Sequence, residues 1–180
     1  VGKTTLINYL SGFLDADQSN IFIDGKRNLN SKTLNFSNLG VVTQEPLIFD
    51  GTIKENLYFQ ENPEINEKKL KKAIQASDLE TFIDQSKLGL ETLINEKGTN
   101  ISGGQLQRIC IARALIFEPK ILILDEATSA LDLQTEKNIL SSLKKINDLT
   151  CIIISHRQET LAFCDKIYEI QDKKILLKDK

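Results

Sequence analysis

Two short, unbroken apolar runs in the second half of the sequence restrict most strongly the folds that this chain can adopt. The runs are "KILILDEA" at 120–127 and "TCIIISH" at 150–156, and polar residues bound each of them. Such runs are typical of strands buried on both faces of a parallel sheet, so we expect both strands to be fully buried. Between them, apolar residues recur at helical spacing, at Ile139, Leu140, Leu143 and Ile146. Strand, helix and strand joined by short links predict the right-handed crossover of an α/β domain.

The rest of the chain extends this alternation over one domain of 180 residues. Helical or strand periodicity is present in five further segments. They are a helix that begins after Thr4, a short strand at 21–26 that runs into a turn at Asp24-Gly25, a strand at 39–49 that ends in a loop containing Pro46, and helices at 66–85 and 105–118, the last with Phe117 on its apolar face. Because the middle third is helical and strongly charged, we expect a helical subdomain at about 46–118 within a single domain that spans 1–180.

The composition favours neither nucleic-acid binding nor a membrane-spanning helix, and it suggests reduced cysteines. The formal net charge is −2, which gives no general attraction to nucleic acid. The apolar runs all fall short of the ~18 residues that a membrane helix needs. Three cysteines, Cys110, Cys151 and Cys164, lie far apart without a C-x-x-C pair, and we expect buried, reduced thiols.

The first motif is Gly2-Lys3-Thr4, followed by Thr5. It matches the last three positions of the phosphate-binding pattern G-x-x-x-x-G-K-[ST]. In that pattern backbone N–H groups and a helix N-terminus surround a phosphate chain, the lysine adds a positive charge, and the hydroxyl binds Mg²⁺. Taken alone, these residues also fit an ordinary exposed loop, although a helical face does begin at Leu6, as the motif requires.

The polar residues at the ends of the predicted strands form a second candidate group. Asp125 and Glu126 follow the first apolar run, at the carboxyl end of a strand, where open α/β sheets bind ligands. Asp125 suits a Mg²⁺ ligand, and Glu126 suits a base that polarises an attacking water. His156 ends the neighbouring strand and could contact a γ-phosphate, and Gln44 ends "GVVTQ" and could reach Mg²⁺ or the water. A solvated strand end and a structural histidine are the alternatives.

Ser102, Gly103 and Gly104 form a third motif, directly before a predicted helix. Their N–H groups and the helix dipole make a second anion site, although the same residues also fit a simple helix cap. Gln105 and Arg108 follow at once. Since one ATP does not need two anion cradles in one chain, we expect the second cradle to serve a nucleotide held by another subunit.

Taken in order, these motifs resemble the nucleotide-binding domain of ATP-binding cassette (ABC) transporters. Gly2 to Thr5 resemble the end of Walker A, Gln44 the Q-loop and His156 the switch histidine. The remaining motifs also match: I-S-G-G-Q (101–105) resembles the signature, I-L-I-L-D-E (121–126) Walker B, and S-A-L-D (129–132) the D-loop. The resemblance covers nearly the whole chain and implies a P-loop NTPase-like, mostly parallel sheet with a helical signature subdomain.

The resemblance implies ATP and Mg²⁺ as cofactors and a role for each motif residue. Glu126, His156 and Gln44 would take part in hydrolysis. Nucleotide would contact Gly2, Lys3, Thr4 and Thr5 of one subunit and Ser102, Gly103, Gly104 and Gln105 of the other. Mg²⁺ would be held by Thr4, Gln44 and Asp125. Two cassettes, identical or different, would then pair head to tail.

Two further segments resemble exporter-type cassettes. They are "QEPLIFDGTIKENL" (44–57) and "TLINEKGTNISGGQ" (92–105), whose Glu96 corresponds to a contact with the membrane domain. The resemblance implies a transmembrane domain, fused upstream and contacted near Gln44 and Glu96, at the cytoplasmic face of a membrane. It also implies that the cassette powers export of a substrate that no residue of this chain touches. A soluble clamp ATPase without a membrane partner is the alternative, and a regulatory cassette that binds without hydrolysing is disfavoured by Glu126 and His156.

The chain differs from the family pattern at a few positions. Ile101, Thr43 and Asn95 stand where leucine, proline and glycine are common. The chain also begins inside Walker A, so we expect an N-terminally truncated piece of a longer protein, without the first antiparallel β region. We therefore expect these 180 residues alone to bind ATP poorly, since several phosphate-facing N–H groups and a core strand are missing.

Overall fold

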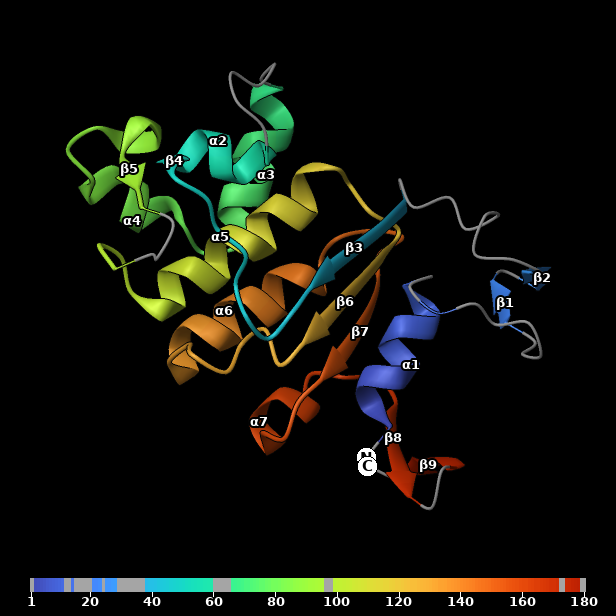
Figure 1. Ribbon diagram of the computed structural model, residues 1–180. Coiled ribbons are helices and arrows are strands. Elements are labelled where there is room, and N and C mark those ends of the chain that lie inside the picture. Colours follow the sequence, from blue (N-terminus) through green and yellow to red (C-terminus); the bar gives the residue numbers. More distant parts are fainter. Residues whose placement is uncertain are drawn as a thin grey trace.

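A computed structural model gives the fold of the chain (Figure 1). It describes residues 2–11, 14, 21–23, 25–28, 38–59, 66–95, 99–171 and 174–178. Within these residues helices and strands alternate as expected, and the α/β class is confirmed.

A parallel three-stranded sheet forms the centre of the domain. Its strands are β3 (Leu39–Val42), β6 (Ile121–Asp125) and β7 (Thr150–Ile154), in the order β3-β6-β7. Val42 lies opposite Leu124, and Asp125 lies opposite Ile154. The three central residues of β6, at 122–124, are fully buried, because β6 has a neighbouring strand on each side and helices on both faces. All three strands therefore end at the same edge of the sheet.

The predicted full burial of the strand at 150–156 is wrong. In β7, Thr150 is exposed and residues 151–154 are half-buried. Among the described strands β7 pairs with β6 alone, so its other edge lacks a neighbour there. Two residues assigned to apolar helix faces, Phe117 and Ile146, are also exposed, because each lies just past the end of its helix.

Helices flank the sheet. The longest are α5 (Gly103–Ile116) and α6 (Leu133–Leu143), which bury apolar residues against the sheet. In Figure 1, α1 (Lys3–Leu10) lies on the other side of the strands and buries Ile7. The short helix α7 (Gln158–Leu161) follows β7. In the part of the chain that is described, no helix has the length and apolar character needed to cross a membrane.

The middle of the chain is mostly helical. In order its elements are β4 (Gly51–Thr52), α2 (Ile53–Tyr58), α3 (Glu67–Ala76), α4 (Glu80–Gln85), the 3-10 helix η3 (Gly89–Glu91) and β5 (Leu93–Ile94). The helices α2 and α3 pack on α5. The single helix predicted at 66–85 is instead two helices. Asp78 takes a left-handed conformation with φ +57°, and this turn allows Leu79 to be fully buried. The subdomain boundary at 46–118 remains a prediction.

Two antiparallel hairpins complete the described structure. The first pairs β1 (Ile21–Ile23) with β2 (Lys26–Asn28), with Gly25 in the turn as predicted. The second pairs β8 (Ile167–Gln171) with β9 (Lys174–Lys178).

The three cysteines are free, as predicted, but only Cys110 is fully buried. Cys151 is half-buried, and burial together with the nearby Cys164 thiol raises the pKa of Cys151 to about 12. At pH 8 its thiolate is therefore roughly a thousandfold scarcer than that of an ordinary cysteine.

We expect iodoacetamide at pH 8 to label Cys151 at least about a hundredfold more slowly in the folded protein than in urea, because the thiolate is the reactive form. Mass spectrometry of the labelled peptides measures both rates. The folded state holds this proton more tightly than the unfolded chain, so stability is constant at neutral pH and falls as pH rises from about 9 towards 12. Equal labelling rates in the two states would contradict the expectation.

Candidate functional site

Three side chains from distant parts of the sequence meet at the carboxyl end of the sheet. Lys3 begins α1, Glu126 follows β6 and His156 follows β7. The Lys3 Nζ lies 2.6 Å from His156 Nε2 and 4.0 Å from Glu126 Oε1. His156 Nε2 lies 3.2 Å from the same Glu126 oxygen. We call these three residues the catalytic cluster, after the roles in ATP binding and hydrolysis that the sequence analysis predicts for them; those roles stay predictions, but the structure does bring the three side chains together.

Two residues in and beside this cluster have a left-handed backbone conformation. Glu126 adopts φ +50°, a left-handed conformation that is unfavourable for a residue other than glycine. The Glu126 N–H donates to the Ile154 carbonyl at 3.0 Å, which extends the pairing of β6 and β7 by one residue. Gly2, at φ +98°, turns the chain into α1. The first-turn N–H groups of α1 have no carbonyl partners within the helix, so they suit an anion.

Asp125 lies beside the cluster and is placed to attract a cation. Burial raises the pKa of Asp125, and the neighbouring Glu126 carboxylate raises it further, whereas Lys3 partly lowers it. A bound cation would relieve both unfavourable effects. The described residues contain no group of three His, Cys, Asp or Glu side chains that could hold a metal alone. This donor set fits Mg²⁺, which usually takes one or two carboxylates together with water and substrate phosphates.

The structure gives less information on the other residues that the sequence predicts for the nucleotide and magnesium site. Gln44 follows β3, so it leaves the sheet at the same edge, but it is exposed and makes no hydrogen bond with the described residues. The side chain of Thr4 and the whole of Glu96 lie outside the described part of the chain. Thr5 is exposed in the first turn of α1.

The predicted second cradle is a capped helix start. Ser102 caps α5: its Oγ accepts from the Gln105 N–H at 3.2 Å, and the Gln105 Oε1 accepts from the Ser102 N–H at 2.7 Å. Gln105 therefore uses its side chain to hold the cap. Gly103 and Gly104 form the first turn, and a Cβ atom on Gly104 would lie 3.2 Å from the Ala130 carbonyl oxygen. Glycine is needed there because another backbone segment approaches closely.

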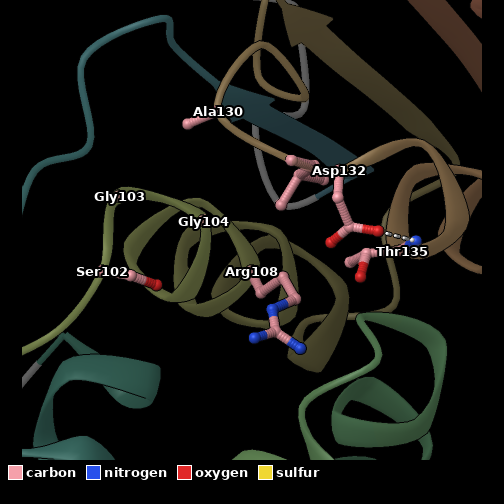
Figure 2. Close-up of a pocket in the computed structure, with 8 residues that line it drawn as sticks. Ser102, Gly103, Gly104, Arg108, Ala130, Asp132 and Thr135 are labelled. Carbon is pink, nitrogen blue, oxygen red and sulfur yellow. Dashed lines mark hydrogen bonds between the residues drawn. The ribbon is translucent and has the colours of Figure 1, made fainter.

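A cavity of about 320 Å³ opens beside this cap (Figure 2). Two segments line it: Ser102, Gly103, Gly104 and Arg108 from the cap and first turns of α5, and Ala130, Leu131, Asp132 and Thr135 from the residues that lead into α6 and from its first turn. The Arg108 side chain lines the cavity, and its guanidinium donates to the Asp78 carbonyl at 2.6 Å. In Figure 1 this end of α5 lies far from α1, so the cradle and the catalytic cluster lie at different places in the chain.

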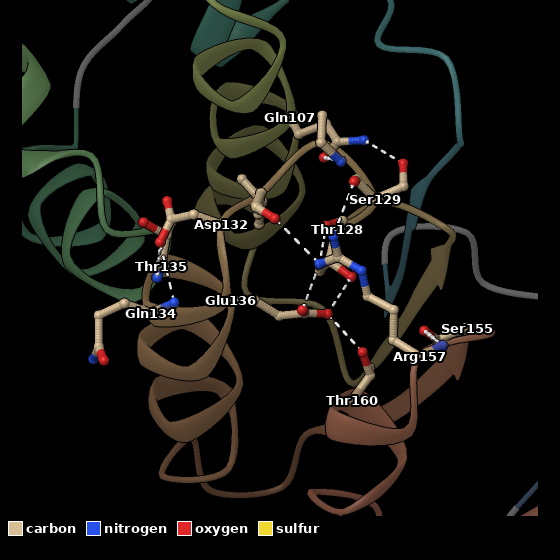
Figure 3. A network of polar contacts seen from close by, with 12 residues as sticks. Gln107, Thr128, Ser129, Asp132, Gln134, Thr135, Glu136, Ser155, Arg157 and Thr160 are labelled. Atoms are coloured by element: carbon tan, nitrogen blue, oxygen red, sulfur yellow. Dashed lines mark hydrogen bonds and ion pairs between the residues drawn. The ribbon is translucent and has the colours of Figure 1, made fainter.

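Sequence reasoning missed a buried polar network beside the cluster, formed by Gln107, Glu136 and Arg157 with their partners (Figure 3). The sequence did contain a signal for this network, at Glu136. Glu136 precedes Ile139, Leu140 and Leu143 at helical spacing, so it lies on the apolar face of α6. A carboxylate on such a face predicts a buried cationic partner.

Comparisons with known proteins agree on one family. The family profile described as ABC transporter matches residues 1–129. The chain is 40% identical to ABC transporter B family member 21 of Arabidopsis thaliana and to Multidrug resistance protein pgp-1 of Caenorhabditis elegans, over 98% of the chain and 14% of each relative. It is 37% identical to the ATP-dependent lipid A-core flippase of Hahella chejuensis, over 97% of the chain and 30% of that protein.

A solved structure gives the same answer. The structure of a bacterial Atm1-family ABC exporter with ATP bound superposes with a TM-score of 0.86 at 33% identity, over 97% of this chain and 31% of that one. The chain thus spans less than a third of the length of each of these proteins. The profile match, the identities and the shared fold show that the chain belongs to the ABC transporter family.

Proposed function

We propose that this chain is the ATP-binding and ATP-hydrolysing domain of an exporter. The observation that carries the proposal is the catalytic cluster, in which a lysine, a carboxylate and an imidazole converge beside the N-terminus of α1. This combination provides charge for a phosphate chain, a base for water and a further polar contact.

Each residue of the cluster has a distinct task in the proposed reaction. Lys3 and the first-turn N–H groups of α1 bind the outer phosphates. Glu126 accepts a proton from the attacking water, and the hydrogen bond from its backbone N–H to the Ile154 carbonyl fixes the backbone that carries it. His156 Nε2 accepts from the Lys3 ammonium in the absence of nucleotide; once nucleotide takes Lys3, the tautomer with its proton on Nε2 donates to the γ-phosphate.

Magnesium would be held by Asp125, with Thr4 and Gln44 as the other proposed ligands, and would neutralise charge on the β- and γ-phosphate oxygens. The raised pKa of Asp125 supports this assignment, because a cation stabilises the carboxylate that burial disfavours.

We further propose that each ATP lies between two cassettes. The cradle at 102–104 lies away from the catalytic cluster of its own chain, which supports a nucleotide shared head to tail with a second cassette. Closure adds the second cradle to each site, so ATP favours the closed pair, and hydrolysis reopens it.

The names of the relatives support export as the output. They include a multidrug resistance protein, a lipid A-core flippase and an Atm1-family exporter. By analogy, a membrane domain contacts this chain near Gln44 and Glu96 and places it at the cytoplasmic face of a membrane. No comparison supports the soluble clamp ATPase.

A test of the shared site uses two differently tagged copies of the protein, each produced from its complete reading frame. One variant is Glu126→Gln and the other is Gly104→Asp, which adds a negative charge and a crowded Cβ to the cradle. With the two changes in different copies, a head-to-tail pair keeps one intact site. With both changes in one copy and a wild-type partner, each site carries one defect.

We expect the first mixture to retain at least about a tenth of the wild-type ATPase activity and the second to fall to roughly a hundredth, because each defect disables its site. The doubly tagged pairs are purified and their phosphate release is measured. The reverse order of activities would show that each chain completes its own site. An inactive wild type would overturn the proposed function.

A further inference from the structure

One short segment connects the catalytic cluster and the cradle within the chain. Residues 128–132 come shortly after Glu126 and end at the cap of α6, and the last three of them line the cavity beside the cradle. We call this stretch the linking segment. Side chains from two different elements hold it, one from α5 and one from the residue after His156 (Figure 3).

From α5, a buried glutamine holds the linking segment by its amide. The Gln107 Oε1 accepts from the Ala130 N–H at 2.9 Å, and the Gln107 Nε2 donates to the Ser129 Oγ at 3.1 Å. Gln107 is only 3% exposed. It lies one helical turn after Gly104, so any shift of the linking segment relative to the cradle breaks these bonds.

From the opposite side, the guanidinium of Arg157 donates to the backbone of the same segment. Its Nη1 reaches the Leu131 carbonyl at 3.1 Å and the Thr128 carbonyl at 3.4 Å, and its Nη2 reaches the Ser129 carbonyl at 3.3 Å. Arg157 directly follows His156. A change in the position of Arg157 therefore changes the position of His156 at the catalytic cluster.

A buried carboxylate fixes the Arg157 guanidinium. Glu136 of α6 is 1% exposed, and its Oε2 accepts from Arg157 Nη1 at 2.7 Å. Its Oε1 accepts from the Thr128 hydroxyl at 2.7 Å and from the Thr160 hydroxyl at 2.6 Å. Three of the roughly four acceptor positions of this carboxylate are used, one of them by Arg157, so the guanidinium is held in one orientation.

We propose that Arg157 and Gln107 are positioning residues for the hydrolysis reaction: together they clamp the linking segment and fix His156 relative to the 102–104 cradle of the same chain. The inference rests on the proposed function. Since each site is completed by two chains, the clamp also sets how the cradle of one nucleotide and the histidine of the other move together. Neither side chain belongs to the catalytic cluster or lines the cavity, so both act through the segment that they hold.

The test uses Arg157→Lys and Gln107→Leu in the protein produced from its complete reading frame. Lysine keeps the charge opposite Glu136 but has one donor group and cannot span the three carbonyls. Leucine keeps the volume of Gln107 but loses both hydrogen bonds. Gln107→Glu is the rescue variant, because its carboxylate accepts from the Ala130 N–H and from the Ser129 hydroxyl. Gln134→Leu is the matched control. Gln134 is exposed, and among the described residues its side-chain amide makes a hydrogen bond with Asn138 alone.

We expect Arg157→Lys and Gln107→Leu each to lower kcat roughly tenfold, with the KM for MgATP within about twofold of wild type, because binding groups are intact and only their alignment is lost. Gln107→Glu should lie within about threefold of wild-type kcat, and Gln134→Leu should match wild type. Hydrogen exchange of the peptide at 127–133 should be faster in the first two variants. This second readout does not depend on catalysis.

The outcomes separate the two proposals. Wild-type kcat in both Arg157→Lys and Gln107→Leu, in an active protein, would overturn the positioning role, whatever the exchange rates. A parallel rise in KM, or equal losses in Gln107→Leu and Gln107→Glu with unchanged exchange, would also overturn it. A wild-type protein without ATPase activity would instead remove the proposed function, and this inference with it.

Discussion

Replacing Glu126 by glutamine is expected to lower the rate of ATP hydrolysis at least about a hundredfold, which is the lower end of the contribution of a positioned general base. Glutamine has nearly the same size and keeps a hydrogen-bond acceptor, but it cannot take the proton of an attacking water. ATP binding should change little, since Lys3 and the N-terminus of α1 supply the phosphate contacts.

The geometry explains why one carboxylate carries this effect. Glu126 Oε1 lies 3.2 Å from His156 Nε2 and 4.0 Å from Lys3 Nζ, so one oxygen faces the two groups that would contact phosphate. Its backbone is held in a left-handed conformation by the hydrogen bond to Ile154. Strain maintained at a functional residue is consistent with a position fixed for chemistry.

A matched control exists in the same chain. Glu118 also has a left-handed backbone, with φ +49°, but its carboxylate is exposed and pairs with Lys69 at 2.9 Å and Lys72 at 3.8 Å. Glu118→Gln should leave turnover unchanged, which separates loss of the base from the effect of glutamine on such a backbone. Single-turnover phosphate release and nucleotide binding are measured on the protein from its complete reading frame. Glu126→Gln with more than a tenth of wild-type turnover would exclude Glu126 as the base.

The sequence predicted the positions of the two central strands β6 and β7, and the convergence of Glu126 and His156, because these signals are local. The apolar run at 121–124 is long enough to identify a strand, and the polar residues that follow it mark the strand end. Parallel neighbours then bring Glu126 and His156 to the same edge of the sheet, whatever the connections are. Gly2 and Lys3 were found because a phosphate site needs a fixed spacing of a few residues.

The features that the sequence did not predict depend on neighbours distant in the chain. The burial of β7 depends on the strands beside it, and its apolar run gives no information about them. The break at Asp78 depends on the docking of Leu79 into the core, which overrides a continuous helical pattern. The clamp on residues 128–132 uses partners that are 21 to 29 positions apart, so local spacing can place Glu136 on a buried face but cannot identify the residues that it holds.

The buried carboxylate of the clamp gives the largest expected effect on stability. Replacing Glu136 by leucine should lower the free energy of unfolding by about 3 kcal/mol, the lower end of the loss for a broken buried ion pair. Leucine fills the space but leaves the Arg157 guanidinium and the hydroxyls of Thr128 and Thr160 without their acceptor. The lower end applies because the Arg157 side chain is 35% exposed and regains some hydration, whereas that of Glu136 is only 2% exposed.

Pulse proteolysis across a urea series measures this loss, with an expected fall of the midpoint by roughly 1 to 3 M. Asp165→Asn is the control: it removes the carboxylate of an ion pair with Lys144 whose side chains are 84% and 56% exposed, so it should change the free energy by at most about 1 kcal/mol. Adding Arg157→Met to Glu136→Leu should recover part of the loss, because no charge is then left without its partner. A Glu136→Leu protein as stable as the Asp165→Asn protein would show that Arg157 is held by the carbonyls of residues 128, 129 and 131 and not by the buried carboxylate.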